Sequence, residues 1–370
     1  MNLLENLKKM EVSNLENGIY TIRNIYNNKI IKIDENQFLE LKVNIELHRE
    51  LMRMGYFDTS NNETPLFKKK EYNFFNYENV QGHRANSIGI IGIPYDASST
   101  GVTGSSRAPQ TLRKLTSGYS NVSRTLDLNG AYKEFNHLDP VFEEDILDCG
   151  DILHIPGESN EDMYTRIKRA VEYLRSYHGI EQLISIGGDH SCTLPLVQSL
   201  TNKDVIVVKL DAHFDNIDKA SYDKTNHANF VKEITQLNNV KKVVHIGVRE
   251  NLYKKSISDK EIFISANQVK KINEISKELK ELSGNIYLSF DFDVLDPNLF
   301  GATSFLLPFG LKEADVKFIF NILAEFNIVG IDLMEYNPIL DQSSRDKHVC
   351  LEILKESINM LLKKRGKSYE

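Results

Sequence analysis

The stretch DVIVVKLDAHFD, residues 204–215, decides the fold class of this chain. It begins as a short run of mostly branched apolar residues, the composition of a strand that is buried on both faces of a sheet. It ends in Asp211, His213 and Asp215, polar side chains at the point where the strand gives way to a loop. A buried strand with polar residues at its carboxyl end is typical of parallel α/β sheets, which keep their sites at that edge.

Similar apolar runs recur on both sides of this stretch, at 87–94, 182–188, 241–248, 285–293 and 327–335. Helical spacing of apolar residues fills three of the segments between them: 161–178, 268–282 and 312–326. This alternation predicts an α/β fold in which helices cover both faces of a mostly parallel sheet. The carboxyl ends of the strands should then share one edge.

The first part of the chain has a different character, so we divide it into an N-terminal extension, 1–85, and a larger domain, 86–370. Alternating apolar residues around Asn27-Asn28 predict a hairpin, and a helix should follow, capped by Asp34 and ending near Gly55. Residues 58–81 are polar and fit a linker. Two interpretations of the extension stay open: an oligomerisation or lid element, or a module that binds an extended peptide at a strand edge.

Composition argues against several classes of function. The net charge of −7 carries no concentrated basic face, so nucleic acid is not expected as a partner. The first residues lack the pattern of a secretory signal and no apolar run reaches membrane-spanning length, so we expect a cytoplasmic protein without a membrane partner. The cysteines are three and far apart, which indicates neither a disulfide framework nor a zinc knuckle.

Acidic residues and histidines gather in tight groups at three strand ends: Asp189 and His190; Asp211, His213 and Asp215; Asp291, Asp293 and Asp296. Strand residues two apart share a face, so members of a group can point the same way. So many carboxylates in one cleft would repel one another unless cations neutralised them. One Asp-x-Asp alone is usually a turn former, but three such groups in this order predict a metal site.

The ligand chemistry narrows the choice of metal. Four carboxylates with two imidazoles, and no thiolate nearby, favour two divalent ions such as Mn²⁺ over a structural zinc. Two ions bridged by carboxylates supply a hydroxide nucleophile near neutral pH. Hydrolysis is therefore the expected class of reaction.

The motifs GGDHS (187–191), DAHFD (211–215) and SFDFDVLDP (289–297) resemble those of the ureohydrolase family, which includes arginase, agmatinase, guanidinobutyrase and formiminoglutamase. The similarity runs from about Ser87 to the C-terminus and includes the loop 104–113. It implies a three-layer α/β/α sandwich around a mostly parallel sheet of about eight strands, and a homo-oligomer, trimeric or hexameric. The first 85 residues are not covered by it.

The resemblance also implies which residues bind each ion and which act on the substrate. One ion would be held by His190, Asp211, Asp215 and Asp291, and the other by Asp211, His213, Asp291 and Asp293. Outside these ligands, His227 would pass a proton to the leaving amine, and Glu335 would receive the guanidinium group of the substrate. The products would be urea and an amine.

The sequence departs from the family pattern around the substrate. After Pro297 the chain reads NLFGATSFLLPFGL, where Thr303 survives among apolar residues in place of small ones. Besides Glu335, we expect Thr303 and Asp223 to contact the substrate. The alternative that Asp223 is a solvated loop residue stays open. Asp223 stands where arginase holds the carboxylate of free arginine, and a carboxylate there would repel it. Free L-arginine is therefore disfavoured, and we expect an agmatinase-like guanidino substrate. Two alternatives are an arginine inside a peptide, giving peptidyl ornithine, and a formiminoglutamase-type amidine.

Two readings from other classes are weaker. A histone-deacetylase-like amide hydrolase would use one zinc ion and other motifs. A non-catalytic scaffold with the same fold should have lost a ligand, yet all six positions are filled.

Overall fold

The computed structural model describes residues 10–14, 19–24, 30–34, 66–68, 70–118, 146–201, 203–217, 224–250, 258–281 and 284–364. By its contacts the chain forms two compact units, Met1–Leu66 and Phe67–Glu370. Each unit is considered by itself below.

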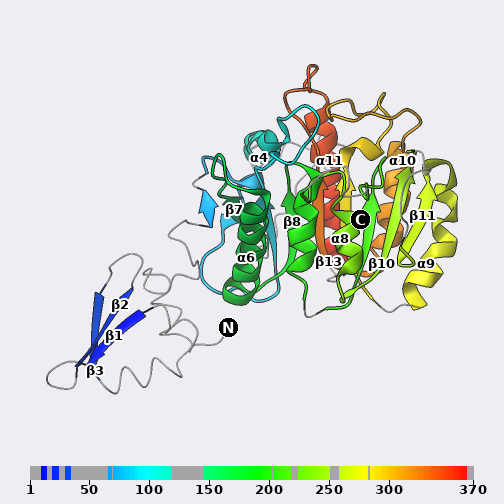
Figure 1. The fold of residues 1–370 in the computed structure, drawn as a ribbon. Helices are drawn as coiled ribbons and strands as arrows, with labels where there is room; N and C mark the ends of the chain where they lie inside the picture. Colours follow the sequence, from blue (N-terminus) through cyan, green and yellow to red (C-terminus); the bar gives the residue numbers. More distant parts are fainter. Residues whose placement is uncertain are drawn as a thin grey trace, which may run out of the picture. The chain divides into compact units, whose positions relative to one another are not determined.

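The larger unit is built on one sheet (Figure 1). Its strands are β4 (Phe67–Lys68), β5 (Glu78–Asn79), β6 (Ser87–Gly92), β7 (Ile146–Ile152), β8 (Ile180–Ile186), β9 (Val205–Leu210), β10 (Val240–Val248), β11 (Glu261–Ser265), β12 (Asn285–Asp291) and β13 (Asn327–Met334). Their order is β11-β10-β9-β12-β13-β8-β6-β7-β4, and β5 also pairs with β7. All neighbours from β11 to β7 are parallel, and β4 is antiparallel. The predicted parallel sheet is confirmed.

Helices cover both faces of this sheet: α4 (Ala108–Ser117), α6 (Asn160–His178), α7 (Thr193–Gln198), α8 (Val231–Gln236), α9 (Ile272–Glu281), α10 (Glu313–Leu323) and α11 (Asp346–Lys364). On one side α6 contacts α7 and α7 contacts α8; on the other α4, α11, α10 and α9 follow one another (Figure 1). Short 3-10 turns lie in the connections between strands and helices: Phe74–Asn76, Ser105–Arg107, His190–Cys192, Ala266–Lys271 and Phe292–Val294. The result is the expected three-layer sandwich.

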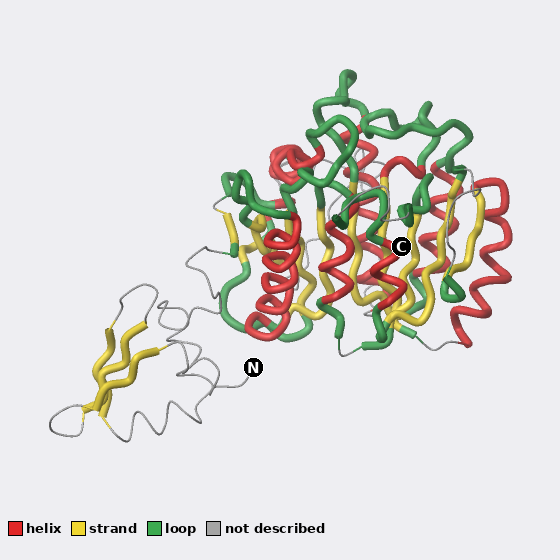
Figure 2. The backbone as a smooth tube through the Cα atoms, viewed as in Figure 1, coloured by secondary structure: helices red, strands yellow, loops and turns green. Residues whose placement is uncertain are grey.

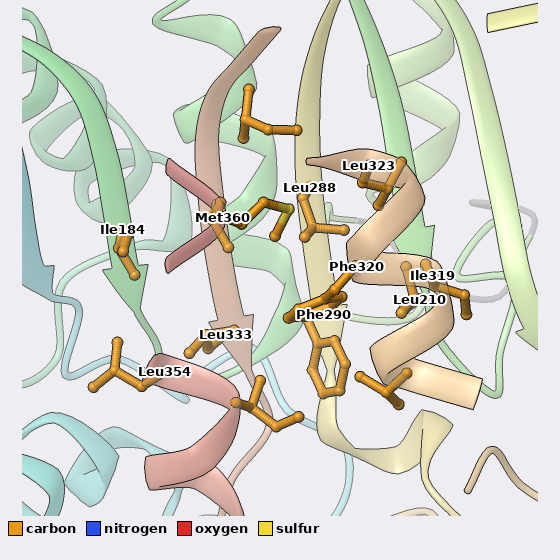
Figure 3. Packing of buried hydrophobic residues seen from close by; sticks show 14 of the residues in the cluster. Ile184, Leu210, Leu288, Phe290, Ile319, Phe320, Leu323, Leu333, Leu354 and Met360 are labelled. Carbon is orange, nitrogen blue, oxygen red and sulfur yellow. The ribbon is translucent and has the colours of Figure 1, made fainter. Parts of the chain in front are cut away.

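Burial explains why these segments form strands. Every residue of β6 and of β9 is buried, as the continuous apolar runs indicate for strands covered on both faces. Figure 3 shows Leu288 and Phe290 of β12 packed against Ile319 and Phe320 of α10. Leu354 of α11 lies in the same cluster. This layer fixes the strands behind the site.

The strand order brings four carboxyl ends together. β12 and β13, late in the sequence, lie between β8 and β9, so the central order is β9-β12-β13-β8. Figure 2 shows long loops along the edge where these strands end. The topology thus gathers the predicted site residues at adjacent positions, as parallel α/β sheets do at a switch point.

A buried charge network ties the segment after Leu66 to the larger unit. Asp148 of β7 accepts from Arg113, at 3.0 and 3.1 Å, and from the backbone N–H of Phe74, at 2.8 Å. Lys70 lies 2.6 Å from the same carboxylate, and Arg113 also pairs with Asp151. We call Lys70, Arg113, Asp148 and Asp151 the β7 network. Because of it, residues 67–81 are part of the sheet unit, whereas the sequence suggested a linker and a boundary after residue 85.

Some elements were not expected from the pattern. Strands β4, β5, β7 and β11 and helices α4, α7, α8 and α11 are additions to the predicted ones. The strand predicted at the start of the stretch 204–215 ends at Leu210, and the one predicted at 285–293 ends at Asp291. Among the described helices, none is long and apolar enough to cross a bilayer.

The smaller unit contains a three-stranded antiparallel sheet: β1 (Met10–Asn14), β2 (Ile19–Asn24) and β3 (Ile30–Asp34). The predicted hairpin is confirmed as the pair β2-β3, while β1 was not expected. The helix predicted to follow Asp34 lies outside the described residues.

Candidate metal centre

The same kind of turn ends three of the site strands. In each, an Asp Oδ1 accepts a hydrogen bond from the backbone N–H two residues further on: Asp189 from Ser191 at 3.1 Å, Asp211 from His213 at 2.6 Å and Asp291 from Asp293 at 2.8 Å. His213 and Asp293 therefore leave the strands and turn inward. Strand alternation, the reason given by the sequence, is not what places them; local Asp turns are.

The glycines before Asp189 are required by packing. A Cβ on Gly188 would overlap the carbonyl of Tyr95, and one on Gly187 would overlap the sulfur of Met334. The end of β8 can therefore lie against Tyr95, in the loop after β6, only with glycine at position 188, and a side chain at position 187 would require Met334 of β13 to move.

The first cluster consists of His190, Asp211, Asp215 and Asp291. Three carboxylate oxygens converge on His190 Nδ1: Oδ2 of Asp211 at 2.9 Å, of Asp215 at 3.2 Å and of Asp291 at 3.0 Å. His190 Nδ1 and Asp211 Oδ2 are buried, and within the described part of the chain neither makes a hydrogen bond of good geometry. Three carboxylate oxygens and one ring nitrogen that converge in this way, with the buried His190 Nδ1 lacking a hydrogen bond of good geometry, fit a divalent ion.

The second cluster consists of Asp211, His213 and Asp293, whose ligand atoms lie within 4.8 Å of one another. His213 Nδ1 is 2.7 Å from Asp293 Oδ2 and 3.6 Å from Asp211 Oδ1. Asp211 thus offers one oxygen to each cluster, as a bridging ligand would. Asp291 lies against this cluster but is not part of it.

The carboxylates of the two clusters repel one another, and this repulsion shifts their pKa values. Burial, together with Asp293 and Asp211, raises the pKa of Asp291 well above its ordinary value. Burial and the charge of Asp211 also raise the pKa of Asp293, to about 6. Burial alone would lower the pKa of His213, but Asp293 and Asp211 raise it to about 12. The site holds excess negative charge that bound cations would relieve.

A lysine that the sequence reasoning passed over also reaches the first cluster. Lys209, in β9, is 1% exposed. Its Nζ contacts Asp211 Oδ2, lies 3.0 Å from Asp215 Oδ2 and donates to the carbonyl of His213 at 2.8 Å. Burial alone would lower the pKa of Lys209, but Asp211 and Asp215 raise it above its ordinary value. Lys209 is therefore a cation.

His227 and Glu335 meet beside the clusters. His227 Nδ1 is 3.5 Å from Glu335 Oε1, and the same oxygen accepts from the backbone N–H of His190 at 2.9 Å. The backbone N–H of Thr100 donates to His227 Nε2 at 2.9 Å, which leaves the proton of the neutral ring on Nδ1, facing Glu335. Burial alone would lower the pKa of His227, but Glu335 raises it.

The model of the arginase family matches residues 86–359. The chain belongs to the arginase family.

Individual relatives agree with this assignment. An agmatinase of Neisseria meningitidis serogroup C is 28% identical over 284 residues, 75% of this chain and 86% of the relative. The agmatine ureohydrolase of Thermoplasma volcanium has a TM-score of 0.64 at 25% identity and covers 81% of this chain and 98% of its own. The Trypanosoma cruzi formiminoglutamase, solved with Mn²⁺, shares the fold: its TM-score is 0.59 at 18% identity, and the match covers 73% of this chain and 92% of the T. cruzi chain. This arginase-family member is a hydrolase acting on C–N bonds of linear amidines.

Further residues of this arginase-family site hold the ligands in place, and the motifs did not single them out for that role. His190 Nε2 lies 2.8 Å from Ser289 Oγ, which donates to Asp332 at 2.7 Å. Asp189, which from its place beside His190 could be expected to orient that ligand, accepts from the backbone N–H and the hydroxyl of Ser98. Polar residues buried in otherwise apolar strands, such as Ser289 and Asp332, were the available signal.

The remaining predicted substrate contacts differ in outcome. Thr303 is buried, and its loop hydrogen-bonds through Ser304 to the carbonyl of Val102, and through Ala302 to Asn337. None of these contacts joins Thr303 to His227 or Glu335. Asp223 lies outside the described residues.

The mouth of the site is apolar, as the departure after Pro297 predicts. Phe305 is 41% exposed, and its ring centroid lies 5.6 Å from that of His227 and 6.3 Å from that of His213. A cavity of about 520 Å³ lies next to it, lined by residues that include Phe214, Arg249 and Phe309. An apolar loop therefore borders the charged clusters.

Proposed function

We propose that this chain is a binuclear metal-dependent ureohydrolase that hydrolyses a guanidino compound other than free arginine, in the manner of an agmatinase. The observation that carries the proposal is the convergence of three Oδ2 atoms, from Asp211, Asp215 and Asp291, on His190 Nδ1. The second cluster, which shares Asp211, supports a second ion. The Mn²⁺ in the T. cruzi neighbour supports Mn²⁺ as the metal.

In this proposal His190, Asp211, Asp215 and Asp291 hold one ion. Asp211, His213 and Asp293 hold the other, with Asp291 beside them. When bound, the two ions supply a nucleophilic hydroxide near neutral pH and neutralise charge that develops on the reacting group.

Glu335 receives the guanidinium. A carboxylate pairs well with this planar cation, and the hydrogen bond from His190 N–H to Oε1 fixes where Glu335 points. Its backbone φ of +66° is unusual for a residue with a side chain and is typical of functional sites. Glu335 therefore orients the guanidinium carbon towards the two clusters.

His227 handles the proton. Water oxygen adds to the guanidinium carbon, the bond from that carbon to the substituted nitrogen breaks, and the departing amine takes up a proton. His227, held by Thr100 on one side and Glu335 on the other, is the residue placed to deliver it. The products are urea and the amine.

The test is a screen for urea release with the metal-stripped chain reloaded with defined ions. We expect turnover of agmatine or a short guanidino acid with Mn²⁺, and little turnover of free L-arginine. A formimino substrate, assayed for formamide, separates the formiminoglutamase-type alternative. Fewer than two ions per chain by elemental analysis, with no turnover, would favour the non-catalytic scaffold.

A second candidate is an arginine within a peptide, and one observation favours it. The smaller unit holds an antiparallel sheet in which β1 and β3 are the outer strands of the described part, and such strands can pair with an extended chain. Thr303 and Asp223 remain proposed substrate contacts in either case. Deleting residues 1–65, which leaves the larger unit intact, should lower turnover of an arginyl peptide and spare agmatine. Equal turnover of both substrates before and after the deletion would remove this candidate and leave an oligomerisation or lid role.

We also propose a cytoplasmic homo-oligomer, a trimer or hexamer, by analogy with the family. Light scattering of the purified chain measures its mass directly. A monomer that is fully active would contradict this part.

A further inference from the structure

Lys209 distinguishes the two proposed ion sites. Its Nζ touches Asp211 Oδ2 and lies 3.0 Å from Asp215 Oδ2, two of the four atoms that surround the first site. An ion bound there would share those oxygens with an ammonium group. The side chain is fully buried and cannot swing into solvent without opening β9 from its neighbours.

Among the described residues, no lysine or arginine pairs with the ligand atoms of the second site. Arg249 lies beside it but donates to the backbone carbonyl of Asp293, at 2.8 Å, and not to the carboxylate. His213, the imidazole of this site, is still 21% exposed in its side chain, whereas that of His190 is 1% exposed. An ion therefore reaches the second site more easily and meets less positive charge there.

We infer that Lys209 is a resident cation of the first cluster, which holds its carboxylates together before metal arrives and makes this the weaker of the two ion sites. The inference rests on the binuclear centre proposed above. Ions then load in order: the site of Asp211, His213 and Asp293 fills first, and the site of His190 and Asp215 fills second. Like charges that share oxygen ligands oppose each other, which is the physical cause.

This role predicts opposite effects on stability and on metal affinity. Lys209→Met removes the charge and keeps the apolar stem. Without metal, the aspartates of the first cluster then repel one another, so the melting temperature of the stripped protein should fall. With metal, the competing charge is gone, so the weaker ion should bind more tightly, with a Kd lower by about 10-fold or more, because a like charge no longer shares its oxygen ligands.

The experiment titrates Mn²⁺ into the EDTA-stripped chain and counts free ion by electron paramagnetic resonance. For the wild type we expect two classes of site of unequal affinity. Lys209→Met should bring them together, and its melting temperature should recover when Mn²⁺ is added. Lys355→Met is the matched control, because Lys355 is also a buried lysine, in α11, paired with Glu352 at 3.2 Å; it should leave both Mn²⁺ affinities unchanged.

Two further variants keep the inference testable if Lys209→Met fails to fold. Asp215→Asn should remove the weak class in the otherwise intact chain, and Asp293→Asn should remove the tight one. Equal affinities in the wild type, the reverse assignment, or a Lys209→Met variant that is destabilised without binding Mn²⁺ more tightly would overturn the inference. A wild type that binds no Mn²⁺ would instead overturn the binuclear centre itself.

Discussion

The larger unit buries two groups of charges, and they differ in balance. The β7 network sets two cations, Lys70 and Arg113, against two carboxylates, Asp148 and Asp151. With the imidazoles of His190 and His213 neutral, as metal ligands are, the two clusters at the strand ends set four carboxylates against one lysine, Lys209. Both groups are rich in hydrogen bonds and both lie in the core, so burial and contacts do not separate them. The difference teaches that charge balance separates a structural network from a metal site.

The largest effect should follow from breaking the unbalanced group. His213→Ala removes an imidazole that lies 2.7 Å from Asp293, so the second ion loses a ligand. We expect metal-dependent urea release to be abolished and the Mn²⁺ content to fall. His348→Ala, at an exposed position of α11, should retain both. Full activity of the His213 variant would contradict the site.

Glu335→Gln should have the next largest effect. It keeps the shape of the side chain but loses the charge that pairs with a guanidinium, and a hydrogen bond to a charged group contributes about 1.5–3 kcal/mol. We expect kcat/KM to fall about 10- to 100-fold with unchanged Mn²⁺ content. Glu313→Gln, at the exposed start of α10, is the control. A variant that also lost metal would assign Glu335 to the metal centre instead.

Asp148→Asn breaks the balanced network and should change stability, not chemistry. Arg113 would remain buried with less compensation, which costs about 3 kcal/mol or more of the free energy of unfolding. Chemical denaturation measures this loss, and both Mn²⁺ sites should persist. Glu78→Gln breaks the exposed pair with Arg84 and should cost less than about 1 kcal/mol. Loss of metal from the Asp148 variant would show that the two groups are coupled.

The smallest effect is in the pH dependence, where the two groups should have opposite signs. Burial alone would raise the pKa of Asp148, but Arg113 and Lys70 hold it below 3.8. Its stabilisation is therefore present above the unfolded pKa and is lost as pH falls through the lower, folded one. The pKa of Asp293 is raised instead, to about 6, so the stripped protein should become more stable as pH falls from 7 to 5.

Melting temperatures of the stripped wild type and of Asp293→Asn between pH 7 and 5 measure this second effect. The gain on acidification should be smaller in the variant, and saturating Mn²⁺ should remove it from the wild type. An identical pH dependence in wild type and variant would mean that Asp293 is not crowded by Asp211.

The sequence predicted elements whose structure follows from the composition of one short segment. The continuous apolar runs of β6 and β9 predict buried strands because such strands are covered on both faces. β7 was missed because Asp148, Cys149 and Gly150 interrupt its apolar run, and these residues make sense only beside Arg113, far away in the chain.

The sequence identified the residues that meet at the candidate site, but not the local structure that brings them together. His190, Asp211, Asp215 and Asp291 meet as expected, yet Asp turns after the strands bring in His213 and Asp293. Lys209 could have been found, because it is the one charged residue in the apolar run of β9 and stands two residues before Asp211. Thr100, by contrast, reaches His227 from a loop, and no local pattern indicates such a long-range contact.

The insertion of β12 and β13 between β8 and β9 has a consequence for folding. The strands that come before β12 in the chain leave a gap between β8 and β9. This gap is filled only when β12 and β13, in the last third of the sequence, are present. Both proposed ion sites use Asp211 from one side of that opening, and Asp291 or Asp293 from the end of the strand that fills it. Pairing between strands so distant in sequence is slow, because the entropy cost of closing the long loop comes before the contacts that stabilise the pair are formed. Metal capture should therefore report the closing step of folding, and a chain that stops before residue 285 should form neither site.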